Sequence, residues 1–210
     1  NLTIAPYANY WKYDHKYTVN LEVIMVIEGK NVSLKLIQQE DIELIRNWRN
    51  SKDVNQFFIF RGYISKAQQK KWFEKISASG KDYYFLIVVD TEPIGLIFTK
   101  DIDWNLREGE TGIFIAKKEY RNSLISFEAS YLHGRHFYEK LNLIKDKIQV
   151  LKSNKRALRY NKKVGFKEVG EKEVEIDGEI CKLVLFEHTR NDWDNRAKKR
   201  EKLLRLLGYK

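Results

Sequence analysis

Residues 119–126 read Glu-Tyr-Arg-Asn-Ser-Leu-Ile-Ser, and they follow an apolar run at 111–116 and precede a helical pattern. The first N–H groups of a helix have no partner within it, and the helix dipole makes that end electropositive. Lys117, Lys118 and Arg121 add positive charge, and the segment contains no proline that would remove a donor. A helix start of this kind is suited to binding a phosphate or a pyrophosphate.

Aromatic residues form a second group with chemical potential. Phe57, Phe58 and Phe60 precede Arg61, and all four lie between two segments with helical periodicity. Aromatic rings can stack on a flat base, and an arginine can pair with a phosphate through parallel hydrogen bonds. Phe57, Phe58 and Arg61 are therefore candidate contacts for a substrate that carries both groups.

The charge balance also favours an anionic partner. The chain of 210 residues has a formal net charge of +10 at pH 7, and a basic segment at 190–210 supplies part of it. Nucleic acids, nucleotide cofactors and sugar nucleotides are all anionic, so charge alone does not choose among them. We interpret the basic segment as a C-terminal helix with a solvated charged face and an apolar side formed by Leu203, Leu204, Leu206 and Leu207.

Other residue types argue against a disulfide framework, a membrane span and a metal site. Cys181 is the single cysteine, which excludes a disulfide within the chain and fits a reducing, cytoplasmic setting. No run of about 18 apolar residues is present, and residues 1–20 lack the apolar stretch of a secretory signal. His133 and His136 have no further ligands nearby in sequence, so we expect solvated histidines on a helix.

The elements that would position these residues alternate between strands and helices. Ser65 and Gln68 form a capping box, Asn154 can cap a later helix, and the Asp-Gly pair at 177–178 predicts a hairpin turn. In chain order, the pattern predicts a strand at 32–38, two helices, strands at 83–90, 94–102 and 111–116, a helix over about 124–140, a strand at 147–151, a helix ended by Gly165, and two final strands.

This order, β-α-α-β-β-β-α-β-α-β-β, resembles the GNAT superfamily of acyl-CoA-dependent N-acetyltransferases. The resemblance covers about residues 30–190 and implies an α/β (α+β) fold, with a mixed, mostly antiparallel central sheet flanked by helices. Each segment is weakly specific by itself, and the order and spacing are specific together. The segments are VSLKLIQQEDIELIRNWRN, ISKAQQKKWFEKI, EPIGLI, ETGIFIAKKEYRN, LNLIKDKIQVLKSNKRALRYNKKVGFKEVG and DGEICKLVLFEHTRNDW.

The details are most similar to the branch that acetylates 4-amino-4,6-dideoxy sugars on a nucleotide carrier, the pseudaminic-acid-pathway type. RNWRN, WFEKI, DIDW and the basic helix after RNDW carry this part of the resemblance. Ribosomal-protein and polyamine acetyltransferases share much of the same pattern. In the resembling enzymes, the loop that corresponds to residues 57–61 covers the acceptor.

The resemblance implies transfer of an acetyl group from acetyl-CoA to an amino group, and we expect that group to belong to a nucleotide-linked amino sugar. The alternatives are acetylation of a protein N-terminus or a polyamine, and a degenerate GNAT domain that binds a ligand without turnover. We expect a small-molecule substrate, no metal, no nucleic-acid partner and a cytoplasmic location, and a homodimer is left open.

The implied cofactor site includes the opening segment. In the family, the segment reads Arg-x-x-Gly-x-Gly, whereas this chain keeps the arginine and replaces both glycines, by Leu124 and Ser126. A left-handed conformation at Leu124 would cost about 1–2 kcal/mol, so we predict weakened or re-posed CoA binding rather than its loss. The expected contacts are Phe114, Ile115, Arg121, Asn122, Ser123, Leu124, Ile125, Ser126 and Asn154.

The implied catalytic candidates are Glu110, Asn161 and Tyr160. The attacking amine must lose a proton, and Glu110 at the start of a strand could accept it through a water, although a solvated glutamate in a turn is an equal alternative. The family often places an acidic tyrosine five positions before a phenylalanine, where this chain has Asn161. Tyr160 is one residue away, or about 100° around the helix, so it cannot simply take that role.

We divide the chain into three parts. Residues 31–190 form the GNAT domain, 191–210 form a basic C-terminal helix, and 1–30 form an extension or an added strand. Met25 precedes the segment where chains of this branch often begin, and Asn1 is not an initiator, so we expect upstream sequence.

Overall fold

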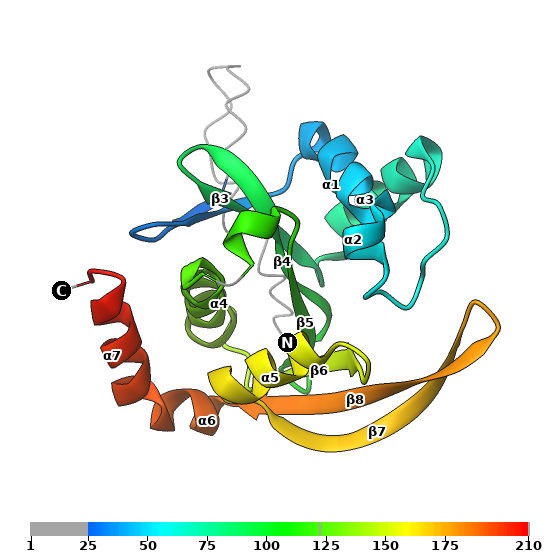
Figure 1. Ribbon diagram of the computed structural model, residues 1–210. Coiled ribbons are helices and arrows are strands. Elements are labelled where there is room, and N and C mark those ends of the chain that lie inside the picture. Colours follow the sequence, from blue (N-terminus) through cyan, green and yellow to red (C-terminus); the bar gives the residue numbers. More distant parts are fainter. Residues whose placement is uncertain (1–24, 122, 210) are drawn as a thin grey trace, which may run out of the picture.

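An eight-stranded sheet is the centre of the computed structural model, which describes residues 25–121 and 123–209 (Figure 1). The strands lie in the order β1-β2-β3-β4-β5-β6-β8-β7, and β5 and β6 form the parallel pair in an otherwise antiparallel sheet. The strands are β1 Val26–Glu28, β2 Ser33–Leu36, β3 Tyr83–Val89, β4 Glu92–Asp103, β5 Glu108–Ile115, β6 Lys145–Leu151, β7 Lys167–Ile176 and β8 Glu179–Thr189. The helices are α1 Ile42–Asn50, α2 Lys52–Asn55, α3 Lys66–Ser79, α4 Ile125–Arg135, α5 Lys155–Val164, α6 Arg190–Asn195 and α7 Ala197–Leu206. The predicted order of strands and helices is confirmed.

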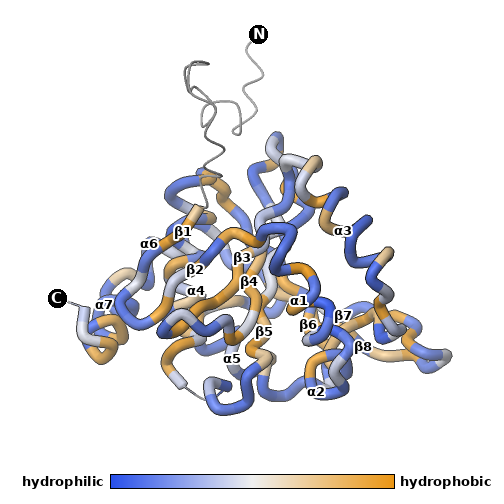
Figure 2. Tube along the Cα trace, turned by 90° about the horizontal axis from the view of Figure 1, so that it is seen from above, coloured by the Kyte–Doolittle hydropathy of each residue, from blue (hydrophilic) through white to orange (hydrophobic). Residues whose placement is uncertain are grey.

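Helices cover both faces of the sheet, because successive strand residues point to opposite sides. Phe85 of β3 belongs to the main core, together with Ala129 of α4. Leu86, its neighbour in sequence, packs with Ile45 of α1 in a second core that also includes α3 residues. Figure 2 shows the apolar residues concentrated along β3, β4 and β5, with hydrophilic segments around them.

The parallel strands β5 and β6 diverge after a short contact. Only Glu108, Gly109 and Glu110 of β5 pair with β6, opposite residues 145–147, although both strands continue beyond these pairs. The later residues of β5 therefore have an open edge toward β6. We call the residues at 108–110 and 145–147 the seam, and the space beyond them the opening.

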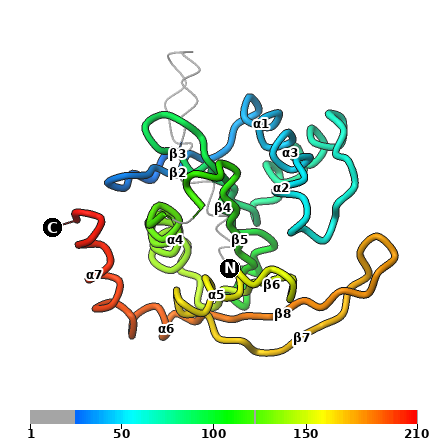
Figure 3. Tube along the Cα trace, in the orientation of Figure 1, coloured from blue at the N-terminus to red at the C-terminus, as the bar shows by residue number. Residues whose placement is uncertain are grey.

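Local sequence signals explain several element ends. Ser65 Oγ accepts a hydrogen bond from Gln68 N at 3.2 Å and Gln68 Oε1 accepts one from Ser65 N at 2.8 Å, which confirms the capping box. Asp177 and Gly178 have φ values of 53° and 82°, as the predicted two-residue hairpin turn requires. Figure 3 shows that this β7–β8 hairpin extends from α6 toward the side of the domain that carries α2 and α3.

The predicted helix at 124–140 is interrupted in its last part. α4 ends at Arg135, and His136–Lys140 continues as a π-helical segment. The expectation of solvated histidines is wrong, because His133 and His136 are each only 4% exposed. His133 Nε2 lies 2.9 Å from Thr99 Oγ1, and the ring of His136 packs against Phe85. The histidines belong to the side of the helix that faces the sheet.

The two ends of the described chain meet at α4. Glu128 accepts hydrogen bonds from Lys30 N, Asn31 N, Asn31 Nδ2 and Tyr209 Oη, at 2.6–2.9 Å. In α7, Leu204 is buried as expected, whereas Leu206 is exposed. No helix of residues 25–121 and 123–209 combines the length and apolar content that a membrane crossing requires.

Candidate active site

The opening between β5 and β6 exposes backbone groups of β5. Ala116 N donates to Ile94 O at 2.8 Å. Because hydrogen-bonded and non-hydrogen-bonded pairs alternate along antiparallel strands, the backbone groups of Phe114 face β4, whereas those of Ile113 and Ile115 face the opening. This alternation favours Ile113 and Ile115 over Phe114 as backbone contacts for a ligand in the opening.

The start of α4 lies directly beyond this edge. Leu124 has φ −70° and ψ −8°, a right-handed helical conformation, so the strain considered for a left-handed Leu124 does not arise. Ser126 Oγ donates to Ser123 O at 3.3 Å, and Ser123 Oγ accepts from Ile125 N at 3.3 Å. In the described part of the chain, no carbonyl partner is found for the N–H groups of Ser126 and Phe127, which makes them candidate donors for an anion. Asn122 lies outside the described residues.

Some of the nearby cations are already paired. Lys117 pairs with Glu92 at 2.6 Å, and Lys118 pairs with Asp53 at 2.5 Å. Arg121 donates to two carbonyl oxygens at the end of β5, those of Ile115 at 3.0 Å and Ala116 at 2.8 Å. These partners are neutral, and Arg121 acts on a carboxylate only at longer range, through its contribution to the lowered pKa of Asp53.

Arg156 in the first turn of α5 adds a second positive charge, and no sequence pattern pointed to it. Its pKa is lowered, first by desolvation and then by the positive charge of Arg121. In the described part of the chain, no ion pair to a carboxylate is found for either arginine. Two mutually repelling guanidinium groups beside a helix N-terminus fit the pyrophosphate of acetyl-CoA, the cosubstrate that the resemblance implies.

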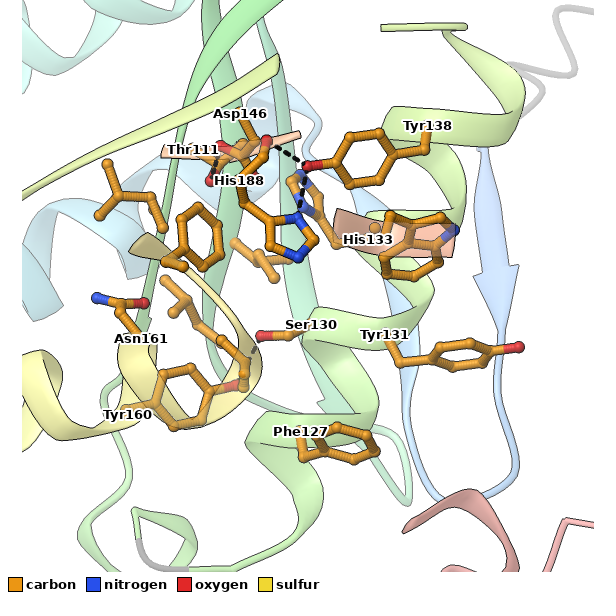
Figure 4. Close-up of a pocket in the computed structure, with 18 of the residues that line it drawn as sticks. Thr111, Phe127, Ser130, Tyr131, His133, Tyr138, Asp146, Tyr160, Asn161 and His188 are labelled. Atoms are coloured by element: carbon orange, nitrogen blue, oxygen red, sulfur yellow. Dashed lines mark hydrogen bonds between the residues drawn. The ribbon is translucent and has the colours of Figure 1, made fainter. Parts of the chain in front are cut away.

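A cavity of about 80 Å³ lies between the opening, α4 and α5. In Figure 4, Thr111, Asp146, His188 and Tyr138 lie toward one end, and Ser130, Tyr160 and Phe127 toward the other. The cavity is large enough for ordered water but too small for the whole cofactor arm. The open edge of β5 beside the cavity remains available to the rest of that arm.

The three helix residues selected from the sequence have different surroundings. Tyr160 Oη lies 2.7 Å from Ser130 Oγ and donates to Ser126 O at 2.9 Å, so it joins α5 to the first turns of α4, and burial raises its pKa to about 12. Asn161 is buried and lines the cavity. Asn154 Oδ1 accepts from Ala157 N at 3.1 Å, which confirms its predicted role as a helix cap.

Glu110 lies at the seam on the face covered by α1 and α3. Its carboxylate is 3.1 Å from Lys100 Nζ and accepts from Gln149 Nε2 at 2.7 Å. It is therefore a held carboxylate rather than a free side chain in a turn. Both partners come from neighbouring strands, and the sequence did not reveal either of them.

Asp146 lies at the seam on the opposite face and was not selected from the sequence. It is 6% exposed and accepts a hydrogen bond from Thr111 Oγ1 at 2.7 Å. Burial raises its pKa well above the ordinary aspartate value, and the negative charge of Glu110 raises it further, whereas the Thr111 hydrogen bond opposes the increase. Asp146 also pairs with His188 on the neighbouring strand β8.

Residues 57–61, which we call the aromatic loop, contact the face of the sheet on which Glu110 lies. Phe58 packs edge-to-face on Phe114 of β5, with ring centroids 5.7 Å apart, and the Arg49 guanidinium carbon lies 3.4 Å from the Phe58 centroid. Phe57 is exposed, and Arg61 lies 3.9 Å from Asp177 at the tip of the β7–β8 hairpin. Loop and hairpin therefore meet beside the opening. Arg49 was missed because nothing in RNWRN shows that it points toward the loop.

No group of three or more His, Cys, Asp or Glu side chains is placed to hold a metal ion in the parts of the chain that the structure describes.

Known proteins share this architecture. Residues 31–167 match the acetyltransferase (GNAT) domain family. The chain is 24% identical over 163 residues to the spermidine N(1)-acetyltransferase of Escherichia coli K12, which covers 75% of this chain and 87% of that protein. It is 28% identical over 130 residues to the acetyltransferase PseH of Campylobacter jejuni, which covers 59% of this chain and 74% of that protein.

A solved structure extends the comparison to three dimensions. The crystal structure of spermidine N-acetyltransferase from Vibrio cholerae, in complex with CoA and spermine, has a TM-score of 0.73 at 19% identity, and the match covers 79% of this chain and 99% of that one. At this identity, the likeness concerns the fold alone. With the family match over most of the chain, it shows that this protein belongs to the GNAT family and is an acetyl-CoA-dependent N-acetyltransferase.

Proposed function

We propose that the acceptor is the amino group of a nucleotide-linked amino sugar, and the environment of Arg49 is the observation that carries this proposal. Arg49 Nε is buried and finds no hydrogen-bond partner among residues 25–121 and 123–209, and one of its terminal nitrogens donates to Phe60 O at 3.3 Å. Burial lowers the pKa of Arg49 to about 10, so the group is still charged at neutral pH. A partly desolvated cation without a carboxylate favours an anionic ligand.

The aromatic loop fits the second part of such an acceptor. Phe57 is exposed, and Phe58 lies against Arg49 and Phe114. A base could stack on these rings while a phosphate oxygen accepts from Arg49. Arg61 is a weaker candidate for the phosphate than the sequence suggested, because Asp177 already lies near its guanidinium.

Proton removal from the amine is assigned to Glu110 in this proposal. Its carboxylate lies on the face that carries the aromatic loop, and it can accept a proton directly or through a water. Lys100 and Gln149 fix its orientation. The cosubstrate supplies an activated acetyl group, and the N–H groups of Ser126 and Phe127, with Arg121 and Arg156, are the groups proposed to hold its phosphates.

A polyamine is the second candidate, because two of the similar proteins are spermidine acetyltransferases. A cationic acceptor requires unpaired acidic side chains, and the segments EDIE and DID are where the sequence offers them. Several of these acids are paired within the protein: Asp41 with Lys35 at 3.2 Å, Glu43 with Arg46 at 2.6 Å and Asp101 with Lys100 at 3.3 Å. This pairing favours the anionic acceptor.

The test compares acceptors and one pair of arginine variants. With acetyl-CoA as donor, the wild type should acetylate a UDP-linked 4-amino-4,6-dideoxy sugar faster than spermidine or an N-terminal peptide. Arg49→Gln should raise KM for the sugar nucleotide at least about tenfold, the equivalent of about 1.4 kcal/mol, and spare KM for acetyl-CoA. Arg159→Gln, on the exposed side of α5, is the matched control. Faster acetylation of spermidine, or equal effects of the two variants, would refute the proposal.

A further inference from the structure

Two carboxyl groups flank the seam between β5 and β6, one on each face of the sheet. Glu110 is paired with Lys147 in the strand register, and Asp146 is paired with Gly109 one position earlier. Because side chains alternate along a strand, Glu110 shares the face of Phe114, whereas Asp146 shares that of Thr111. Asp146 lines the cavity between α4 and α5, on the other side of the sheet from the aromatic loop.

Gly112 and Ile113, at the exposed edge of β5, line the same cavity as Asp146, so the inference that follows puts the thioester on this side of the sheet and the amine on the side of Glu110. In this arrangement, acetyl transfer moves one proton on each side of the sheet. The amine must lose a proton when it attacks, and the sulfur that leaves the acetyl group must gain one to become a thiol. The assignment of Glu110 covers the loss. We therefore ask which group lining the cavity can supply the gain.

The aromatic hydroxyls and the guanidinium that line the cavity are poor donors. Tyr138 Oη donates to His188 O at 2.9 Å, and burial raises its pKa. Tyr160 donates to Ser126 O, with a pKa raised to about 12 by burial. Arg200 stacks on the Trp193 ring and, like other arginines, holds its proton too firmly to act as an acid.

The histidines and the amide in the cavity are also unsuitable. Burial lowers the pKa of His133 to about 3 and that of His188 to about 4, so both rings are neutral at neutral pH. A neutral imidazole is too weak an acid to protonate a thiolate. Asn161 carries no ionisable proton. Tyr131 also lines the cavity, but its ring stacks on Trp193 and its hydroxyl points away from the other lining residues (Figure 4). Among the described residues that line this cavity, Asp146 is the ionisable group that remains.

We propose that the Asp146 carboxyl is the general acid of acetyl transfer and donates its proton to the departing sulfur. As the carbon–sulfur bond breaks, the carboxyl O–H bond breaks with it, and the products are a thiol and the Asp146 carboxylate. Glu110 holds the proton taken from the amine. Transfer of one proton from Glu110 to Asp146 through solvent restores both groups, so the cycle balances.

The groups that face Asp146 are consistent with a neutral carboxyl. Thr111 donates from β5, His188 lies across from it on β8 as a neutral ring, and Glu110 on the other face is negative. In the described part of the chain, no ion pair joins Asp146 to a Lys or Arg. A thiol proton is held about as firmly as that of free cysteine, near pKa 8.5, so an acid assists departure even though it is not indispensable.

The first test does not depend on turnover. In uniformly ¹³C,¹⁵N-labelled wild-type protein, the Asp146 carboxyl resonance is assigned by through-bond correlation with its own backbone amide, so the assignment needs no variant. We expect it to titrate at a higher pH than the other aspartates and to be that of the protonated acid at pH 7, with and without CoA. An ionised Asp146 at pH 7 in both states would overturn the proposal.

The second test separates an acid from a structural residue by the shape of the pH profile. With any acceptor that the wild type acetylates, Asp146→Asn should lower kcat about 100-fold, within the usual range for general acids. Wild-type kcat should fall at high pH, with the same midpoint as the pH titration of the Asp146 carboxyl resonance. The kcat of Asp146→Asn should not show this fall. Thr111→Val, which removes the one donor that favours the carboxylate, should move the fall to higher pH.

The outcomes are distinguishable from failure of the sugar-nucleotide proposal. A preference for spermidine would change the acceptor used in the assay and leave both expectations for Asp146 unaltered. An unchanged high-pH fall in Asp146→Asn would overturn the role of Asp146, whatever the acceptor is.

Discussion

Glu128 and Asp146 are both buried acids, but the protein treats them in opposite ways. Glu128 is 0% exposed and accepts four hydrogen bonds, from Lys30 N, Asn31 N, Asn31 Nδ2 and Tyr209 Oη. Asp146 is 6% exposed and accepts one from the described residues, that of Thr111. Burial raises the pKa of both side chains, but the hydrogen bonds outweigh it only at Glu128, whose pKa is lowered.

The difference shows that burial alone does not decide whether a carboxyl group is charged. Donors that point at the oxygens stabilise the ionised form, and several donors can replace the lost water. A carboxylate that accepts several hydrogen bonds is suited to holding chain segments together. A buried carboxyl group with few donors keeps its proton and is suited to act as an acid.

The largest expected effect tests the fastening role. Glu128→Ala leaves four donors without their acceptor, and we expect a loss of about 3–5 kcal/mol in the free energy of unfolding, measured by urea denaturation. Glu139→Ala is the control, because its i,i+4 pair with Arg135 is solvent-exposed, and such pairs contribute about 0.5 kcal/mol or less. Similar costs for the two variants would break the comparison.

The second prediction uses pH to separate the two acids. Because the folded-state pKa of Glu128 is lowered, its stabilisation is present above about pH 4.3 and is lost as the pH falls. Because that of Asp146 is raised, stability is lost as the pH rises above about 3.9, by up to about 1.4 kcal/mol per pH unit until the folded-state pKa is reached.

Denaturation at a series of pH values should therefore give opposite results for the two isosteric variants. Glu128→Gln should weaken the loss of stability in acid and be less stable than wild type at pH 7. Asp146→Asn should remove a loss between pH 4 and neutrality and be at least as stable as wild type at pH 7. A destabilised Asp146→Asn with an unchanged pH dependence would show that Asp146 is ionised.

The smallest expected effect concerns a single hydrogen-bond donor to Glu128. Tyr209→Phe removes one of the four donors to Glu128, and we expect a cost of about 1 kcal/mol in unfolding free energy. In a double variant with Glu128→Ala, the Tyr209→Phe change should add almost nothing, because the acceptor is already absent. Full additivity would mean that the Tyr209 hydroxyl stabilises the protein through Lys30 N, from which it accepts a hydrogen bond at 2.9 Å, rather than through Glu128.

Much of the fold could be predicted because its signals are local. The capping box at Ser65, the Asn154 cap and the Asp177-Gly178 turn each depend on neighbours within a few positions, and all three are present. Strand order along the chain also followed from periodicity. The buried face of α4 did not, because His133 looks polar in sequence and is satisfied by Thr99 on a distant strand.

The site was less predictable for a similar reason. The sequence pattern predicts a strand that starts at residue 147, whereas β6 begins at Lys145. The prediction therefore put Asp146 outside the strand, between two lysines. Its burial depends on the seam with β5 and on pairing with His188, which are contacts across the sheet. Arg49 likewise could not be selected from the sequence, because its contact with Phe58 depends on how the aromatic loop packs in the fold.

The short seam also has a mechanical consequence. The strands from β1 to β5 form one leaf and β6, β8 and β7 form another, and a few residue pairs join them like a hinge. The far end of β5 lies about 16 Å from that hinge, at about 3.3 Å per residue, so a rotation of about 10° would displace it by about 3 Å. Glu110 and Asp146 sit on the pivot itself. A rotation about the seam would thus widen the opening while the distance between the two acids stays nearly constant.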